Sequence, residues 1–101
     1  YKGKYRGNQT ERDLAYHQGT AWPWLLGPFA DAWLNVHLEK GKQFVQSLYF
    51  DFEKVMTEAG IGTVSEVYDG DPPYEAGGAI SQAWSVAELN RIKWLLGQQY
   101  I

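Results

Sequence analysis

Cysteine is absent from this chain, and histidine occurs only as His17 and His37. Without thiols the protein has neither a disulfide framework nor a thiolate metal site, which fits the reducing cytoplasm that we expect as its location. Neither histidine has a second histidine at the spacing of a metal-ligand pair, so we expect no metal site. We also expect no cofactor.

Long apolar runs and clustered charge are missing as well. No stretch is long enough to cross a lipid bilayer, so we expect no membrane partner. The net charge is −3 at pH 7 with the two signs mixed, whereas nucleic-acid binding favours a clustered basic face. We therefore expect no nucleic-acid partner. Only residues 1–12 lean basic, and we interpret them as a solvated arm or linker, in a loop or a short edge strand.

Aromatic side chains are what the chain has in excess. They make up 16% of its 101 residues, and 45% of the residues are hydrophobic. A chain of this length forms one small domain that buries only about two-thirds of its unfolded surface. Either its core is unusually aromatic, or some rings face a ligand or a larger body. Since the sequence starts at Tyr1 without an initiator methionine, we interpret residues 1–101 as a piece of a longer protein.

Three helices are predicted from the spacing of apolar residues. The first extends from Trp22 and is ended by Lys40 and Gly41; it is apolar around most of its circumference and has Pro23 in its first turn, where a missing N–H costs nothing. Thr20 is its expected N-cap. The second helix, 42–59, is apolar on one face, whereas the third, 81–96, is again apolar nearly all round. We expect the first and third helices to be enclosed by other elements and the second to lie on the outside.

The connections between these helices predict where the intervening loops lie. The link around residues 40–42 is short, so the first and second helices should be antiparallel neighbours. Segments 13–20 and 60–80 both precede an enclosed helix, which places them at the same end of the helical layer. We expect the chemistry of the protein at that end.

Glu66 stands out within the segment 60–73. It lies in a β-prone run, Thr63–Tyr68, between glycines and the turn sequence Asp-Gly-Asp-Pro-Pro. A carboxylate held on rigid backbone beside a helix end suits a catalytic acid or base. The ordinary alternative is a solvated glutamate, or one paired with a nearby arginine, and the residues alone leave both readings open.

Several polar residues could either contact a ligand or hold the loops. Asp69 and Asp71 flank Gly70, where they could fix an Asx-type turn or hydrogen-bond to sugar hydroxyls. His17 could hold its loop or contact a substrate, whereas His37 lies near the far end of the first helix and should be structural.

Aromatic residues at the proposed functional end present the same choice. Trp22, Trp24 and Trp84 begin the enclosed helices, and their flat faces could stack on sugar rings or pack in the core. Gln82 and Tyr68 could line the same site. The tryptophans further along the helices, which we expect in the core, are Trp33 and Trp94.

Three motifs carry a resemblance to a known family. They are Tyr16-His17-Gln18-Gly19-Thr20-Ala21-Trp22-Pro23-Trp24, then Gly62-Thr63-Val64-Ser65-Glu66-Val67-Tyr68-Asp69-Gly70-Asp71-Pro72-Pro73, then Ser81-Gln82-Ala83-Trp84-Ser85-Val86-Ala87-Glu88. In this order they resemble the C-terminal end of glycogen debranching enzymes, the amylo-α-1,6-glucosidase domain. Three motifs in matching order are far more specific than one short pattern.

The resemblance implies both a fold and a reaction. The family fold is an all-α (α/α)6 barrel with its active site at one rim. This chain, residues 1–101, would be a C-terminal fragment that contributes the three predicted helices and the β-prone loop around Glu66. The reaction is the inverting hydrolysis of α-1,6-glucosidic branch points in glycogen, with Glu66 as the base that activates water. In the family the acid is an aspartate far upstream, so this chain alone should be inactive. The carboxylates near enough in sequence to be considered instead are Asp13, Asp69, Asp71 and Glu75.

The resemblance also implies partners and substrate contacts. The expected partners are glycogen or a limit-dextrin α-glucan and the upstream part of the same enzyme. Two alternatives remain open: a glucoamylase-like α-glucosidase, or a non-catalytic carbohydrate-binding or interaction piece, which the aromatic residues and the missing acid favour. The expected substrate-binding residues are His17, Trp22, Trp24, Tyr68, Asp69, Asp71, Gln82 and Trp84.

Overall fold

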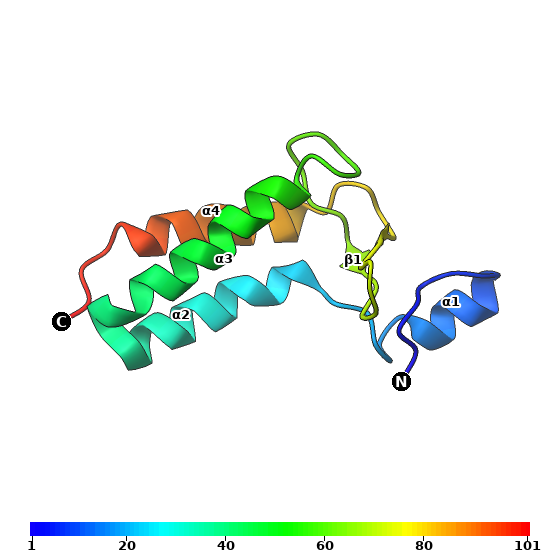
Figure 1. Cartoon of the computed structure of the whole chain (residues 1–101), viewed down its shortest axis with the longest axis horizontal. Coiled ribbons are helices and arrows are strands. Elements are labelled where there is room, and N and C mark those ends of the chain that lie inside the picture. Colours follow the sequence, from blue (N-terminus) through cyan, green and yellow to red (C-terminus); the bar gives the residue numbers. More distant parts are fainter.

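Three helices lying side by side form the body of the molecule in the computed structural model, which describes all of residues 1–101 (Figure 1). They are α2 (Leu26–His37), α3 (Lys42–Val55) and α4 (Ala83–Leu96), and each contacts the other two. The chain is elongated, with extents of 49 × 28 × 21 Å. The mostly helical class and all three predicted helices are confirmed. None of the helices has the length and apolar character that a membrane span requires.

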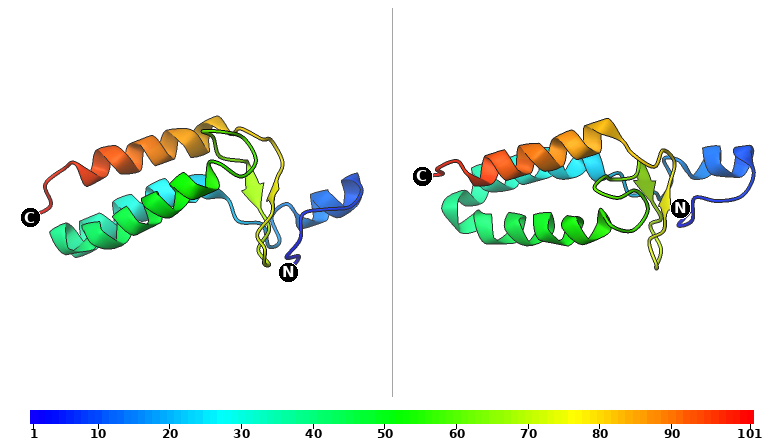
Figure 2. Two further views of the ribbon diagram at one scale, coloured as in Figure 1. Left: turned by 45° about the horizontal axis from the view of Figure 1, so that its top comes forward. Right: turned by 90° about the horizontal axis from the view of Figure 1, so that it is seen from above.

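The N-terminal helix α1 (Gln9–Ala15) was not predicted. Asn8 caps it, because the Asn8 side chain accepts from the backbone N–H of Glu11 while the Glu11 carboxylate accepts from that of Asn8. This reciprocal capping satisfies two N–H groups that have no partner inside the helix. The prediction of a loop or edge strand is therefore wrong for residues 9–12. Helix α1 lies beyond the end of the three-helix body (Figure 2).

The predicted first helix begins later than expected. A 3₁₀ turn, η1 (Pro23–Leu25), precedes α2, and Pro23 occupies its first turn as the sequence indicated. Thr20 is not the N-cap, because its hydroxyl donates to the carbonyl of Tyr16 at 2.6 Å. Trp22 occupies the cap position, and its side chain makes no capping hydrogen bond to the helix. A second 3₁₀ turn, η2 (Leu38–Gly41), connects α2 to α3, and α3 ends at Val55 rather than near residue 59.

A small antiparallel sheet lies within the segment that precedes α4, and one backbone bridge connects it to the segment that precedes α2. Strand β1 (Val67–Tyr68) pairs with β2 (Ala76–Gly77). Tyr68 also forms a bridge with Ala21, with N···O distances of 2.8 and 2.9 Å. Of the predicted β-prone run, only its last two residues form a strand. The bridge ties the segment before α2 to the segment before α4.

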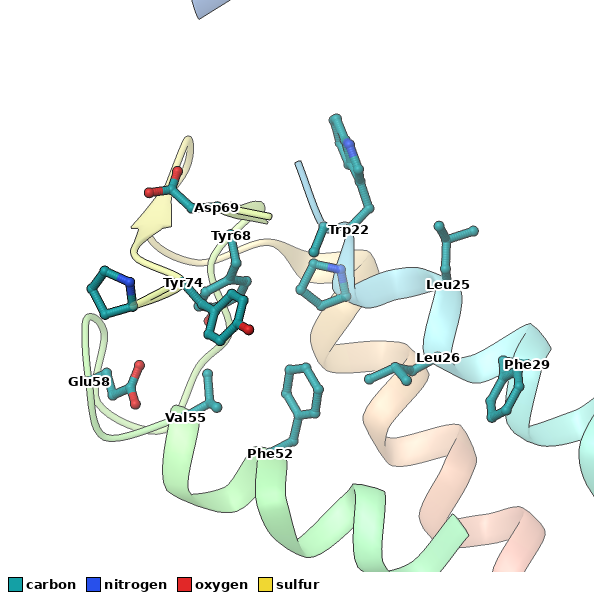
Figure 3. Close-up of a pocket in the computed structure, with 13 residues that line it drawn as sticks. Trp22, Leu25, Leu26, Phe29, Phe52, Val55, Glu58, Tyr68, Asp69 and Tyr74 are labelled. Carbon is teal, nitrogen blue, oxygen red and sulfur yellow. The ribbon is translucent and has the colours of Figure 1, made fainter. Parts of the chain in front are cut away.

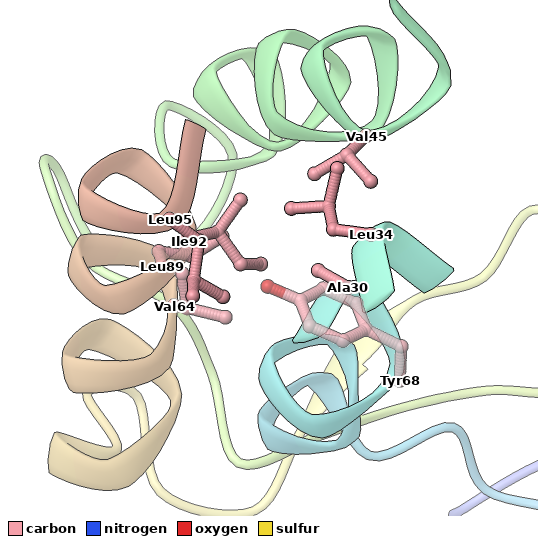
Figure 4. Packing of buried hydrophobic residues seen from close by; sticks show 8 residues of the cluster. All are labelled: Ala30, Leu34, Val45, Val64, Tyr68, Leu89, Ile92 and Leu95. Atoms are coloured by element: carbon pink, nitrogen blue, oxygen red, sulfur yellow. The ribbon is translucent and has the colours of Figure 1, made fainter. Parts of the chain in front are cut away.

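The hydrophobic core lies between the three helices and is closed at one end by the loop before β1 (Figure 4). Only 16 of the 101 residues are buried, so the core is small for the apolar content of the chain. The buried cluster consists of Ala30 and Leu34 on α2, Val45 on α3, Leu89, Ile92 and Leu95 on α4, and Val64 and Tyr68.

Large apolar side chains remain exposed on both helices that were predicted to be enclosed. Phe29 and Val36 on α2 are 43% and 74% exposed, and Trp84 and Trp94 on α4 are 48% and 62% exposed. Trp94 is thus outside the core, contrary to expectation, whereas Trp33 packs partly buried against it. Apolar surface of this kind on two adjacent helices is typical of an interaction surface.

The basic N-terminal arm, residues 1–7, is not a free solvated arm. The Lys2 amide donates to the carbonyl of Gln18 at 2.6 Å, and the Gly3 carbonyl accepts from the Asp71 amide at 3.1 Å. The arm therefore runs between the two motif segments and is fixed to both by backbone hydrogen bonds.

Candidate active site

A cavity of about 440 Å³ lies at the end of the body where α2 and α4 begin. Its volume lies within the range of small-molecule sites, roughly 300–1,000 Å³. Segments 13–20 and 60–80 both contribute residues to it, which confirms that the two segments meet at one end of the helical body. It is lined by Tyr16, His17, Trp22, Trp24, Leu25, Glu66, Gln82 and Trp84.

Glu66 is held in this cavity by donors on both carboxylate oxygens. The Ala79 amide donates to Oε1 at 3.0 Å, and the Tyr16 hydroxyl donates to Oε2. The Glu66 amide in turn donates to the Ala79 carbonyl at 2.9 Å. Gly78 approaches the carboxylate so closely that a Cβ there would overlap it, and its φ of +67° favours glycine. The carboxylate therefore has a defined position and is only partly buried.

Tyr16 is a member of the site to which sequence reasoning assigned no role. The hydrogen bond from its hydroxyl to Glu66, together with burial, raises the pKa of Tyr16 to about 12, so the hydroxyl remains a donor at neutral pH. Its ring meets Trp22 edge-to-face, with ring centroids 4.7 Å apart. The only indication of this role in the sequence was that Tyr16 begins the same motif as His17. Leu25 is a further lining residue that was not predicted.

Aromatic rings form one wall of the cavity. The His17 ring stacks on Trp22 at 5.1 Å with an interplanar angle of 9°, and Trp22 meets Trp84 edge-to-face at 6.4 Å. Trp24 lies against Trp84 at 5.4 Å. Gln82 adds an amide that can donate and accept hydrogen bonds. Aromatic rings next to an amide and a carboxylate suit a ligand with an apolar face and hydroxyl groups.

Asp69 and Asp71 lie outside this cavity and bind the N-terminal arm. Asp69 is 3% exposed, accepts from the Tyr5 amide at 2.7 Å, and has Lys4 and Arg6 at 3.6 and 3.7 Å. Asp71 accepts from the Tyr1 hydroxyl at 2.7 Å, and this bond raises the pKa of Tyr1. These contacts support the loop-fixing interpretation, with the arm rather than the local turn as partner.

Tyr68 and Asp69 line a second, mostly apolar cavity of about 520 Å³ (Figure 3). Its walls come from the start of α2, the end of α3 and the loop after β1, with Phe29 and Phe52 among its aromatic members. Trp22 and Leu25 line both cavities, so the two adjoin. Tyr68 and Asp69 are therefore neighbours of the Glu66 cavity but not part of it.

The sequence matches the profile of the amylo-alpha-1,6-glucosidase family over residues 1–91, which include every residue that lines the Glu66 cavity. The chain belongs to this family. No individual curated protein and no solved structure matches it. Membership of the amylo-α-1,6-glucosidase family relates the chain to glycoside hydrolases of the glycogen-debranching type.

Carboxylates are the groups that glycoside hydrolysis requires, and Glu66 is the only carboxylate that lines the cavity. Asp13 accepts from the Gln9 side chain at 2.7 Å on α1, and Glu75 pairs with Arg6 at 2.9 Å. No three histidine or acidic side chains cluster as they would around a metal ion. This chain thus brings a single carboxylate to the site.

Proposed function

We propose that this chain is the C-terminal part of an inverting glycoside hydrolase that releases glucose from α-1,6 branch points of glycogen or a limit dextrin. Glu66 is the general base. The observation that supports the proposal most is the environment of Glu66: its carboxylate is held by two hydrogen bonds in a cavity of sugar size, beside tryptophan rings. This environment occurs in a chain of the amylo-α-1,6-glucosidase family.

The base has one task in the reaction. The oxygen of a water molecule bonds to the anomeric carbon on the face opposite the leaving group, and a proton of that water passes to Glu66. The bond from the anomeric carbon to the branch-point oxygen breaks, and that oxygen takes a proton from a carboxylic acid. Inverting enzymes separate the two carboxyl groups by roughly 6.5–9.5 Å, which leaves room for the water.

The remaining cavity residues bind the sugar. The faces of Trp22, Trp24 and Trp84 pack against the C–H faces of glucose units. His17 and Gln82 hydrogen-bond to hydroxyl groups, and the stacking of His17 on Trp22 fixes its ring. Because Asp69 and Asp71 are occupied by the N-terminal arm, their part in the site is to hold the loop that follows Glu66.

An upstream part of the same enzyme supplies the acid and covers the exposed helices. The cavity of this chain has one carboxylate only, and α2 and α4 expose Phe29, Val36 and Trp94. An (α/α)6 barrel, in which further helices pack on these faces, satisfies both requirements. The chain on its own should then bind sugar weakly and hydrolyse nothing.

Substitution of Glu66 by glutamine in the enzyme that contains this chain tests the proposal. The amide keeps the shape of the side chain but cannot accept the proton, so glucose release from a branched limit dextrin should fall about 10²- to 10⁴-fold. Glu75→Gln is the matched control, since Glu75 is an exposed carboxylate outside the cavity. A Glu66→Gln enzyme with nearly wild-type glucose release contradicts the proposal.

A second candidate function, carbohydrate binding without catalysis, is favoured by the single carboxylate of the cavity. It predicts measurable binding of a glucan by the isolated chain, unaffected by Glu66→Gln but abolished by Trp84→Ala. Calorimetric titration with a branched dextrin measures the binding and its dependence on Glu66 and Trp84. Glucose release in the presence of the upstream part then distinguishes the hydrolase from a binding protein.

A further inference from the structure

The hydrogen bond between Tyr16 and Glu66 connects residues that are 50 positions apart and belong to different motif segments. We propose that Tyr16 is a positioning residue for the hydrolysis, whose hydroxyl holds the Glu66 carboxylate in the orientation that accepts the proton of the attacking water. The inference rests on the proposed role of Glu66 as base. It adds that the Tyr16 hydroxyl fixes the orientation of the Glu66 carboxylate.

The two donors on Glu66 leave a defined set of free lone pairs. Tyr16 occupies a lone pair of Oε2 and the Ala79 amide one of Oε1, at 3.0 Å. Each carboxylate oxygen has two acceptor positions, so one on each oxygen remains for water. With both bonds made, the carboxylate cannot rotate about its terminal torsion without losing a donor. A general base has to lie within hydrogen-bond reach of the proton that it takes, so this restriction acts directly on the rate.

Tyr16 is itself fixed before any substrate binds. Its carbonyl accepts from the Trp22 indole at 3.2 Å and from the Thr20 hydroxyl at 2.6 Å, and its ring packs on Trp22. The backbone bridge between Ala21 and Tyr68 holds the two segments at a constant separation. The hydroxyl is therefore preorganised, and little ordering remains to be done when the substrate arrives.

The protonation state of Tyr16 agrees with a donor role throughout the physiological range. Its hydrogen bond to Glu66 raises its pKa to about 12, so the phenol carries its proton throughout the physiological pH range. The structure allows one other role, because Tyr16 lines the cavity and its ring could contact the sugar directly. The experiment has to separate these two roles.

A double-mutant cycle in the enzyme that contains this chain makes the separation. The variants are Tyr16→Phe, Glu66→Ala and both together, assayed with α-glucosyl fluoride, whose good leaving group keeps residual rates measurable. Phenylalanine retains the ring that packs on Trp22 and removes only the hydroxyl. Tyr1→Phe is the control, because it removes the same kind of phenol–carboxylate bond, to Asp71, outside the cavity.

Tyr16→Phe should lower kcat about 10- to 100-fold with KM nearly unchanged, since a base displaced by a fraction of an ångström loses much of its rate. Tyr1→Phe should keep the wild-type kcat. In the Glu66→Ala background, Tyr16→Phe should cause no further loss, because a residue that acts through Glu66 has nothing left to position.

Two results overturn the inference about Tyr16, and both differ from the result that would overturn the role of Glu66. A Tyr16→Phe enzyme with wild-type kcat shows that the hydroxyl is dispensable. An equal loss in both backgrounds shows that Tyr16 contacts the sugar or supports the fold. Failure of the proposed function looks different, because then Glu66→Ala itself leaves kcat near the wild-type value.

Discussion

Substitution of Gly78 tests whether the position of the Glu66 side chain depends on the absence of a Cβ at residue 78. The φ of Gly78 is +67°, and a Cβ there would lie 3.0 Å from the Cβ of Glu66, 3.1 Å from its Cδ, and closer still to Oε1. Gly78→Ala therefore has two separate effects: it strains the backbone of residue 78, and it pushes the Glu66 side chain away from its present position.

The two effects have different magnitudes and are measured differently. A non-glycine residue in the left-handed region costs about 1–2 kcal/mol of stability. The overlap with Glu66 cannot be relieved without moving the carboxylate by something like an ångström, and a misplacement of that size costs about 10²-fold in rate. The first effect appears in urea denaturation, and the second in kcat for glucose release by the enzyme that contains this chain.

Gly62→Ala provides the matched control. Gly62 has a similar φ of +73°, but no atom lies within 4 Å of where its Cβ would be. Both variants should lose about 1–2 kcal/mol of unfolding free energy, whereas only Gly78→Ala should lose activity. Equal kcat in the two variants, or an equal loss in both, refutes the reasoning that the glycine is needed to make room for Glu66.

Four further predictions concern the core, the arm and the effect of pH. Leu34→Ala, at a fully buried position of α2, should lower the unfolding free energy by about 2–5 kcal/mol in urea denaturation. Ser85→Ala should leave stability unchanged or raise it by about 1 kcal/mol in the same assay, because the buried Ser85 hydroxyl has no partner; a loss contradicts this. Asp69→Asn removes the charge that the Tyr5 amide faces, so hydrogen exchange at that amide should become faster, and an unchanged rate contradicts the anchoring role. The pKa of Tyr16 is raised from 10.0 to about 12 by its hydrogen bond to Glu66. The stability that this bond contributes is therefore complete below pH 10 and is lost as the pH rises through 12. The ratio of the wild-type kcat to the Tyr16→Phe kcat should accordingly stay constant between about pH 6 and 9.

The sequence was sufficient to predict the three main helices and their antiparallel order, because each has a long apolar pattern. Helix α1 was missed because it is short and polar and is stabilised mainly by its cap; the pattern Asn8-x-x-Glu11 was the available signal. The start of the first helix was placed too early, since apolar spacing does not distinguish the extended residues 21–22 and a 3₁₀ turn from an α-helix.

For the site, the order of the motifs predicted most of the residues that line the cavity, but not the hydrogen bonds between them. The cavity contains Glu66 and the predicted His17, Gln82 and three tryptophans, but not the predicted Tyr68, Asp69 and Asp71. The hydrogen bond from Tyr16 and the attachment of Asp69 and Asp71 to the arm depend on contacts between segments far apart in the chain. No local pattern encodes such pairings, so they required the structure.

The central claim, that Glu66 is the base of an inverting hydrolysis, is tested most directly by chemical rescue of the Glu66→Ala enzyme with azide. Azide is a nucleophile without a proton, so it needs no base to attack the anomeric carbon. The account predicts that the wild-type enzyme releases β-glucose from an α-linked substrate, as inversion requires. It also predicts that azide restores turnover of the Glu66→Ala enzyme and that the product, identified by proton NMR, is β-glucosyl azide. Release of α-glucose by the wild-type enzyme, no restoration by azide, or an α-glucosyl azide product would contradict the account.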